Sequence, residues 1–175
     1  MAISAAVGLI WRMKLAHVFV ETAAPIGASI TLLALLTGAI WGKPTWGTWW
    51  VWDARLTSTL IQFFLYLGII SLHQSIENRD TASKATAIAC LVGVVNLPII
   101  KFSVNWWNTL HQPATFTLTE SPAMATEMWV PGLIMVLGFY MLFAYLVTLR
   151  MRSEILEREK GSAWVKAYLE KLNVL

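Results

Sequence analysis

The sequence predicts an all-α integral membrane protein, a bundle of four full transmembrane helices and one partial N-terminal helix, with a tryptophan-rich loop on the outer side. Composition supports this class, because 57% of the 175 residues are hydrophobic and only 13% are charged. Pattern supports it too: several apolar runs are free of charge over about 20 residues, the length that a helix needs to cross a bilayer. The chain is therefore expected to form one membrane domain rather than a soluble globule.

The apolar runs define the predicted helices in chain order. The first, at about 1–11, is partial, because at 1.5 Å per residue it covers about half of a hydrocarbon core about 30 Å thick. We expect it to be the second half of a span. The four full spans are 15–41, 56–73, 85–102 and 130–149. Residues 1–149 then form the transmembrane domain, and 150–175 form a charged tail that is expected to continue as an amphipathic helix as far as Lys171.

The distribution of basic residues predicts the orientation of the spans. Ten of the thirteen Lys and Arg residues fall on one side of the predicted topology: Arg12, Lys14, Arg79, Lys84, Arg150, Arg152, Arg158, Lys160, Lys166 and Lys171. The other side carries Lys43, Arg55 and Lys101. Because basic residues are enriched in cytoplasmic loops, the ten-residue side is expected to be cytoplasmic. The loops at 42–54 and 103–129 then share the opposite face.

Several functional classes are not expected. The single cysteine, Cys90, lies in an apolar run, so there is neither a Cys-x-x-Cys motif nor an internal disulfide. No glycine-rich phosphate loop and no nucleophile–base arrangement stands out, so we expect no enzyme, and any ATP hydrolysis would belong to another subunit. The net charge is +3, but the basic residues lie in particular loops, and this distribution indicates membrane topology rather than nucleic-acid binding. The first ten residues do not have the pattern of a cleavable signal peptide.

Residues 46–58 are the most unusual stretch of the chain. Four of the ten tryptophans, Trp46, Trp49, Trp50 and Trp52, fall within seven residues. On a helix, Trp46, Trp49, Trp50 and Asp53 would share one face, since they stand at i, i+3, i+4 and i+7. Such a shelf of indoles would suit a large planar aromatic ligand, because offset stacking adds to burial. The alternative is an aromatic belt where the membrane meets water.

The second outer loop contributes a candidate metal ligand. His111 follows Trp106, Trp107 and Asn108 in that loop. A neutral imidazole is a good axial ligand for haem iron. Trp107 and His111 stand at i and i+4, so a short helical turn would stack one over the other. The alternative is a surface histidine in a hydrated loop.

Charged residues next to the tryptophans allow two compatible interpretations. Asp53 is suited to cap a helix that starts at Ala54, because its carboxylate accepts backbone N–H bonds. The long side chain of Arg55 can extend to the membrane–water interface. In a haem site, Arg55, Lys43 and Lys101 would instead meet the two propionates, since arginine pairs with carboxylates in a bidentate manner.

The other two histidines lie near the cytoplasmic side. His17 and Glu21 stand at i and i+4 inside an apolar run, and ionisable residues there are functional suspects. We expect a mutual structural pair, because no other ionisable group is evidently within reach. His73 is expected to be an interfacial residue at the end of its span. These positions offer no pair of facing histidines of the kind that transmembrane electron transfer would need.

At these residues the chain resembles a known family. Residues 46–57, Trp-Gly-Thr-Trp-Trp-Val-Trp-Asp-Ala-Arg-Leu-Thr, resemble the tryptophan-rich WWD signature of the haem-handling membrane proteins of cytochrome c maturation. Within that superfamily, residues 41–44 (Trp-Gly-Lys-Pro), 93–100 and 106–112 resemble the family of the C component, CcmC, or haem exporter protein C. The resemblance extends from about Ala5 to the start of the tail.

The resemblance implies a function. The outer loops would bind haem b at the periplasmic face of a bacterial inner membrane, through Trp46, Trp49, Trp50, Trp52, Asp53, Arg55, Trp106, Trp107 and His111, with His111 on the iron. The haem would pass to the chaperone CcmE, and the chain would associate with the ABC transporter subunits CcmA and CcmB and with the small membrane protein CcmD. His111 matches one of two outer histidines of the family. The other precedes the second of the usual six spans, and we expect it to be absent here together with the first span.

Three functions remain open at this point. Non-enzymatic binding and transfer of haem agrees best with the motifs. A haem-translocating transporter subunit should show a polar or histidine-lined route through the spans, and only His17 and Glu21 are candidates for one. A haem lyase component would share the tryptophan motif, but lyase relatives are larger and carry further histidines.

Overall fold

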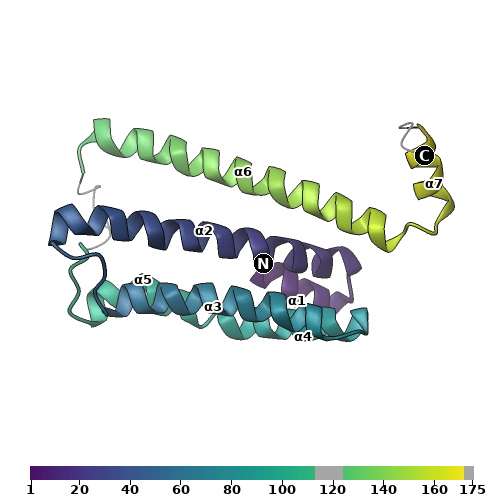
Figure 1. Cartoon of the computed structure of the whole chain (residues 1–175), viewed down its shortest axis with the longest axis horizontal. Helices are drawn as coiled ribbons and strands as arrows, with labels where there is room; N and C mark the ends of the chain where they lie inside the picture. Colours follow the sequence, from purple (N-terminus) through teal and green to yellow (C-terminus); the bar gives the residue numbers. More distant parts are fainter. Residues whose placement is uncertain (113–123, 172–175) are drawn as a thin grey trace.

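The computed structural model describes residues 1–112 and 124–171, and the ordered elements in these ranges are all helices (Figure 1). In chain order they are α1 (Ala2–Trp11), α2 (Lys14–Trp46), α3 (Ala54–Ser75), α4 (Arg79–Gly93), α5 (Asn96–Trp106), α6 (Thr126–Arg158) and α7 (Ala163–Lys171). Four segments are long and apolar enough to cross a membrane: α2, α3, α4 with α5, and α6. The predicted fold class, with four full spans and one short N-terminal helix, is therefore confirmed.

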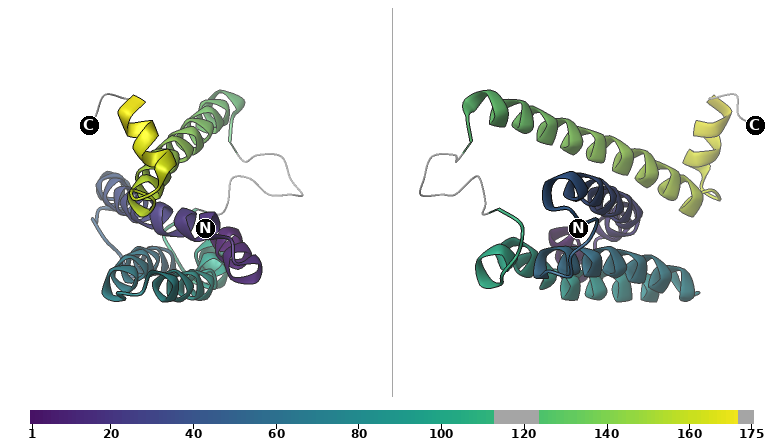
Figure 2. Two further views of the ribbon diagram at one scale, coloured as in Figure 1. Left: turned by 90° about the vertical axis from the view of Figure 1, so that its right-hand side faces the viewer. Right: turned by 60° about the vertical axis from the view of Figure 1, so that its left-hand side comes forward.

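Helices α1 to α6 lie roughly along one axis, with α2 at the centre (Figure 1). The α3 helix lies along α2, and α4 and α5 follow one another along α3, while α1 packs against the first half of α2 and against α4 (Figures 1 and 2). The α6 helix contacts α2 from the other side, where the rings of Phe19 and Phe143 meet edge to face at 6.5 Å. From that contact α6 diverges toward its own start (Figure 1).

Small side chains form the core where α1 to α4 meet. Ala5, Ala24 and Ala87 are almost fully buried and pack with Val20 and Ile69. Small residues let helix backbones approach closely in a membrane, where no hydrophobic force draws apolar helices together. Such a close approach occurs at Gly27 of α2, where an added Cβ would lie 2.7 Å from the ring of Tyr66 on α3.

The third predicted span is not one uninterrupted helix. Residues 85–102 were expected to be continuous, but α4 ends at Gly93 and α5 begins at Asn96. Pro98 lacks a backbone N–H, so it cannot donate to the turn before it. The side chain of Asn96 donates instead to the backbone oxygen of Ser58 at 2.9 Å and to Oε1 of Gln62 at 3.2 Å, both on α3. These two bonds hold the start of α5 against α3.

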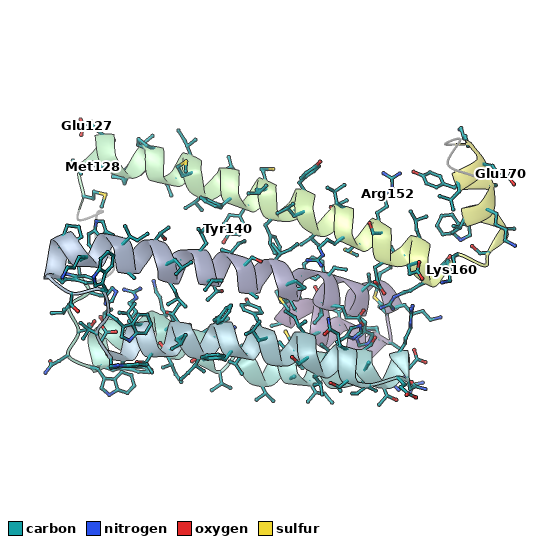
Figure 3. All side chains as sticks on the ribbon, viewed as in Figure 1. Glu127, Met128, Tyr140, Arg152, Lys160 and Glu170 are labelled. Carbon is teal, nitrogen blue, oxygen red and sulfur yellow. The ribbon has the colours of Figure 1, made fainter. Side chains whose placement is uncertain are left out.

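The C-terminal region also differs from the expectation of one amphipathic helix beyond residue 150. The α6 helix continues without a break to Arg158, and α7 is a separate helix that turns away from it (Figure 2). The connection is stabilised locally, because Ser162 Oγ donates to the backbone oxygen of Glu159 at 2.7 Å and Trp164 Nε1 donates to Glu159 Oε2 at 2.5 Å. Most large apolar side chains of α6 are exposed, Met128 and Tyr140 among them (Figure 3), and Val147 is the one buried residue of this fully described helix.

Candidate functional site

Two segments that carry tryptophans, residues 46–53 and 106–111, meet at one end of the bundle. At this end α2 and α5 finish and α3 begins. The α2 helix ends at Trp46, because Gly47 adopts a φ of 77° and its N–H donates to the backbone oxygen of Lys43 at 3.0 Å. Residues other than glycine are strained in this left-handed region, so Gly47 suits a helix end. The chain then runs without regular structure to Asp53, and α3 starts at Ala54.

The predicted helical shelf of indoles is therefore wrong. Because Gly47 ends α2, Trp46 belongs to that helix, whereas Trp49, Trp50 and Trp52 lie in the loop that follows and share no helical face with it. In this loop the rings of Trp50 and Trp52 meet edge to face at 5.5 Å. Trp49 and Trp52 are 58% and 75% exposed. The segment thus presents two indoles outward from a loop rather than three along a helix.

Asp53 connects the two segments. Its Oδ1 accepts the backbone N–H of Leu56 at 2.8 Å, so the predicted cap of the helix at Ala54 is confirmed. Its Oδ2 lies 2.9 Å from Nδ1 of His111 and also accepts the hydroxyl of Thr109. The hydroxyl oxygen of Thr109 in turn accepts the backbone N–H of His111 at 3.1 Å. The Asp53 side chain is only 3% exposed, so this carboxylate is a buried junction between the loops.

The charge on Asp53 determines which ring nitrogen of His111 carries a proton. Burial raises the pKa of the Asp53 carboxyl, but the hydrogen bonds from Thr109, the Leu56 N–H and His111 outweigh burial and hold that pKa below its usual value. An ionised carboxylate only accepts hydrogen bonds, so Nδ1 of His111 carries a proton. In the neutral ring Nε2 then has a free lone pair. A ring N–H donated to a carboxylate is the usual arrangement around metal-bound histidines.

The surroundings of His111 differ from the predicted stack on Trp107. Residues 107–112 do not form a helical turn, so the i, i+4 relationship does not bring these two rings together. The His111 ring instead meets Trp46 edge to face, with ring centroids 4.8 Å apart. Trp106 stacks on Phe102 at 5.4 Å and meets Trp107 edge to face at 5.8 Å. The structure thus brings Trp46, Asp53 and His111 together, while Trp106 and Trp107 form a separate exposed pair.

Two polar groups of the tryptophan segment lack partners among residues 1–112 and 124–171. The indole nitrogen of Trp50 is buried and makes no hydrogen bond there, although an indole N–H is a donor that is costly to bury unpaired. The guanidinium of Arg55 is half-buried in the first turn of α3, and no described residue forms an ion pair with it. Lys43 differs from both, because its Nζ donates to the backbone oxygen of Gly47 at 3.0 Å and so stabilises the end of α2.

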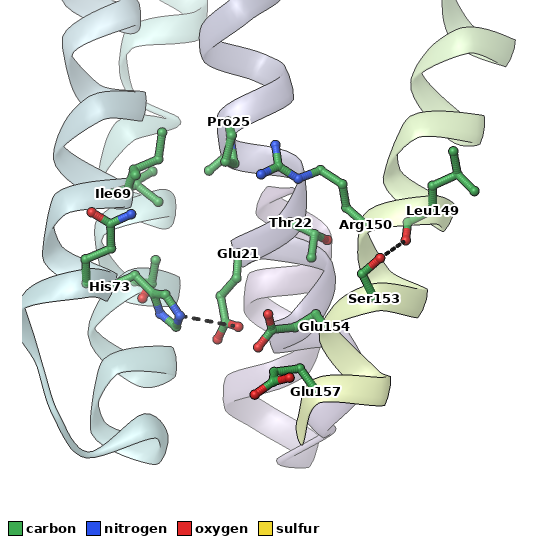
Figure 4. Close-up of a pocket in the computed structure, with 14 residues that line it drawn as sticks. Glu21, Thr22, Pro25, Ile69, His73, Leu149, Arg150, Ser153, Glu154 and Glu157 are labelled. Carbon is green, nitrogen blue, oxygen red and sulfur yellow. Dashed lines mark hydrogen bonds and ion pairs between the residues drawn. The ribbon is translucent and has the colours of Figure 1, made fainter. Parts of the chain in front are cut away.

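The predicted pair of His17 with Glu21 is wrong. Glu21 Oε1 accepts the hydroxyl of Ser83 on α4 at 2.5 Å, and Oε2 pairs with the guanidinium of Arg158. Nε2 of His73 lies 3.7 Å from the same oxygen (Figure 4). The His17 ring packs against Gly8 of α1, and its Nδ1 has no partner among the described residues. The expectation failed because Arg158 stands 137 residues from Glu21, so spacing along one helix does not reveal it.

One residue of the site escaped sequence reasoning. Thr109 hydrogen-bonds both Asp53 and His111, yet its position two residues before the histidine is not a recognisable signal. No cluster of three or more His, Cys, Asp and Glu side chains exists within the described part of the chain. A haem iron does not need one, because the porphyrin itself supplies four ligands and the protein adds only axial ones.

Comparisons with known proteins agree on one family. The chain matches the family model described as "Heme exporter protein C", CcmC, over residues 1–166. It is 52% identical over 172 residues to heme exporter protein C of Haemophilus influenzae, covering 98% of this chain and 70% of that relative. It is 50% identical over 173 residues to the protein of the same name in Escherichia coli K12, with coverages of 98% and 69%. The Bradyrhizobium diazoefficiens relative is 50% identical over 162 residues, with coverages of 93% and 62%.

Proposed function

Because this chain belongs to the haem exporter protein C family, we propose that it binds haem b at the periplasmic face of the inner membrane and passes it to the haem chaperone CcmE. The iron would be held by His111, and the porphyrin would lie against the exposed indoles of the loop before α3. The chain would act as a carrier of the haem rather than as an enzyme.

The Asp53–His111 contact is the observation that carries this proposal. At 2.9 Å, a buried carboxylate fixes the proton on Nδ1 and leaves Nε2 as the basic nitrogen. Partners of this kind orient the ring and raise its basicity toward a metal, and losing them lowers metal affinity about 10–100-fold. His17 and His73 have no such carboxylate partner at hydrogen-bonding distance among the described residues. Of the three histidines, His111 is therefore the best prepared to ligate iron.

Aromatic side chains support binding of the macrocycle. Trp49 and Trp52 expose large apolar rings beside the junction, and each aromatic contact contributes about 0.5–1.5 kcal/mol beyond burial. Trp46 contacts the His111 ring directly and would limit its rotation. A ligand held by one axial nitrogen and by stacking can be released intact, which is what transfer to a chaperone requires.

The propionates would find partners in the same loop. Arg55 has no competing ion pair among the described residues, and the buried indole N–H of Trp50 is a donor without an acceptor. Lys43 is already engaged at the end of α2, so Arg55 and Trp50 are the better candidates, with exposed Lys101 on α5 as a further cation. We infer haem b because covalent attachment needs cysteine thiols, and the only cysteine, Cys90, is buried in α4.

The proposed orientation and partners follow from charge and from the family. Most Lys and Arg residues lie at the end of the bundle away from His111, which favours a cytoplasmic position for that end. We propose that the ABC transporter subunits CcmA and CcmB and the small protein CcmD assemble with this chain in the membrane. The polar groups around Glu21 are engaged with one another, so they favour a structural role over the alternative of a haem route through the spans.

Absorption spectra of the haem-loaded protein in detergent test the site. His111→Ala should shift the Soret band and lower haem retention, whereas His17→Ala and His73→Ala should leave the band in place. Thr109→Val should lower retention and Thr109→Ser should restore it, because only the hydroxyl contacts Asp53 and His111. An unchanged spectrum for His111→Ala, at unchanged helical content, would remove His111 from the site.

A further inference from the structure

The α7 helix runs across the axis that the other helices share (Figures 1 and 2). Two contacts fix its direction. Trp164 Nε1 donates to Glu159 Oε2 at 2.5 Å in the turn before α7. Further along, the guanidinium of Arg152 on α6 donates to the hydroxyl of Tyr168 and lies 5.4 Å from the centre of that ring. Since α6 is long and apolar enough to cross a membrane, a helix that runs across its axis lies along the membrane surface.

The sequence of α7 has the amphipathic pattern that suits this position. One arc of the helix carries its four large apolar side chains: Trp164, Val165, Tyr168 and Leu169. Lys166 and Lys171 lie at the two edges of this apolar arc, and Glu170 lies opposite to it, since successive residues of a helix are about 100° apart. A helix of this kind can place its apolar arc at the boundary between headgroups and acyl chains and its lysines on the headgroups.

The apolar arc faces the side on which α6 exposes apolar side chains. Met141, Tyr145 and Arg152 share one face of α6, and Met141 and Tyr145 are 64% and 61% exposed. Tyr168 contacts Arg152 at the end of this exposed face. Arg152 lies on the α6 side of α7, whereas Glu170 projects away from the bundle (Figure 3). The apolar arc therefore lies over the lipid that would cover Met141 and Tyr145, and Glu170 points toward water.

The cations around the apolar arc are not paired with carboxylates of the described part of the chain. Within residues 1–112 and 124–171, no carboxylate forms an ion pair with Arg152, Lys166 or Lys171. Arg152 donates to a neutral hydroxyl, and both lysine side chains are exposed. The apolar arc is thus bordered by positive charge that these residues leave uncompensated, and such charge attracts anionic headgroups.

We propose that α7 lies on the membrane surface and binds the anionic headgroups of phospholipids. The apolar arc enters the boundary between headgroups and acyl chains, and Arg152, Lys166 and Lys171 meet the phosphates. Trp and Tyr side chains prefer this boundary, because each has an apolar ring and a polar edge. Arginine is well suited to phosphate. The proposal needs only that α6 crosses the membrane, and it does not depend on the proposed function.

The size of the apolar arc favours a lipid surface over a protein partner. Val165 is only 1% exposed, so three of the four apolar side chains of this nine-residue helix remain accessible. Stable protein interfaces bury about 800 Å² and about 20–30 residues on each partner. A membrane has no such requirement, because α6 already holds α7 at its surface.

Spin labels on the full chain in lipid nanodiscs test the proposal. Leu169→Cys and Glu170→Cys, each combined with Cys90→Ser, place a label on the apolar arc and on the opposite side at neighbouring positions. The measured quantity is the ratio of accessibility to oxygen, which dissolves in lipid, to accessibility to a water-soluble nickel chelate. In discs that contain phosphatidylglycerol, this ratio should be several-fold higher at residue 169 than at residue 170. Equal ratios would place both sides of α7 in water and overturn the proposal.

Discs of phosphatidylcholine with and without phosphatidylglycerol test the role of charge. Phosphatidylglycerol should raise the ratio at residue 169. Changing Lys166 and Lys171 together to Gln should remove this increase, since each lysine near an anionic surface strengthens binding about fivefold. Lys160→Gln is the matched control, because Lys160 is exposed but lies before α7 and pairs with Glu157, and it should leave the increase in place. An increase that survives the double substitution would contradict binding through these lysines.

Two further observations keep the test decisive. A label at residue 169 that neither reagent reaches would mean that protein covers the apolar arc, and the lipid proposal would be wrong. Hydrogen exchange of the unmodified chain needs no substitution, so it applies even if a labelled variant does not fold. The backbone amides of residues 166–171 should exchange several-fold more slowly in discs with phosphatidylglycerol than in discs without it, and equal rates would overturn the proposal.

Discussion

Asp53, the residue that caps α3, lies 2.9 Å from Nδ1 of His111, which stands 58 residues later in the chain. The same carboxylate accepts the backbone N–H of Leu56 with its other oxygen. One side chain therefore starts a transmembrane helix and fixes the proton of the candidate ligand. In the proposed function this residue would serve both the stability of α3 and the binding of haem, and substitutions can separate the two roles.

Asp53→Asn and Asp53→Ala should affect different properties. Asparagine caps helices about as well as aspartate, so Asp53→Asn should fold normally but bind haem about 10–100-fold more weakly, because the ring loses its carboxylate partner. Asp53→Ala should lower the free energy of unfolding by about 1–2 kcal/mol more than Asp53→Asn does, because alanine also removes the cap. Haem titration and thermal unfolding in detergent distinguish the two effects. Equal haem affinity in wild type and Asp53→Asn would contradict the role of the carboxylate.

The stabilisation that comes from the Asp53 charge should depend on pH in a defined direction. Its pKa in the folded protein lies below the ordinary value of 3.8, so the folded state favours the ionised form. This contribution is fully present above the pKa of the unfolded chain, and it is lost as pH falls through the lower pKa of the folded protein. The difference in unfolding free energy between wild type and Asp53→Asn should be constant from pH 7 to about pH 5 and shrink below about pH 4. If this difference in unfolding free energy instead grows as the pH falls, the prediction that folding lowers the pKa of Asp53 is wrong.

Asn96→Ala should loosen the start of α5. The substitution removes the hydrogen bonds to the Ser58 carbonyl and to Gln62, and single side-chain bonds between membrane helices contribute about 0.6–2 kcal/mol. Because α5 leads into the His111 segment, haem retention should fall together with stability. Gln62→Ala is the matched control, since it removes one acceptor and leaves the bond to Ser58. A larger effect from Gln62→Ala than from Asn96→Ala would show that Asn96 is not the anchor.

Glu21 and Arg158 should behave as a coupled pair. Breaking a fully buried ion pair costs about 3–5 kcal/mol, because the remaining charge is left without a partner. The Glu21 side chain is 5% exposed and that of Arg158 is 20% exposed, so each single change to Gln should cost somewhat less than that range. The double variant should be more stable than the sum of the two single changes predicts. Additive losses in urea unfolding would mean that the two residues do not interact.

Much of the fold follows from local sequence features. Charge-free apolar runs predict the spans, since helices satisfy their backbone hydrogen bonds within lipid. Asp53 before Ala54 predicts the start of α3, because capping depends on neighbouring residues only. Gly47 is also a local signal for a helix end, and the predicted helical shelf is incorrect because α2 stops there. Trp46, Asp53 and His111 became candidates because of their residue types and because the distribution of Lys and Arg predicts that their loops lie on the same side of the membrane.

Only the tertiary structure decided which candidates touch. The junction of Asp53, Thr109 and His111 joins segments 56 or more residues apart, and Glu21 pairs with Arg158 and not with His17 four residues before it. The break before Asn96 depends in the same way on the carbonyl and amide that α3 presents to it. Local periodicity determines which face a residue occupies, whereas the distance between helices depends on how the small side chains at Ala24, Gly27 and Ala87 pack. That packing is a property of the whole bundle, so the sequence determined the helices and the candidate residues, and the tertiary structure decided their partners.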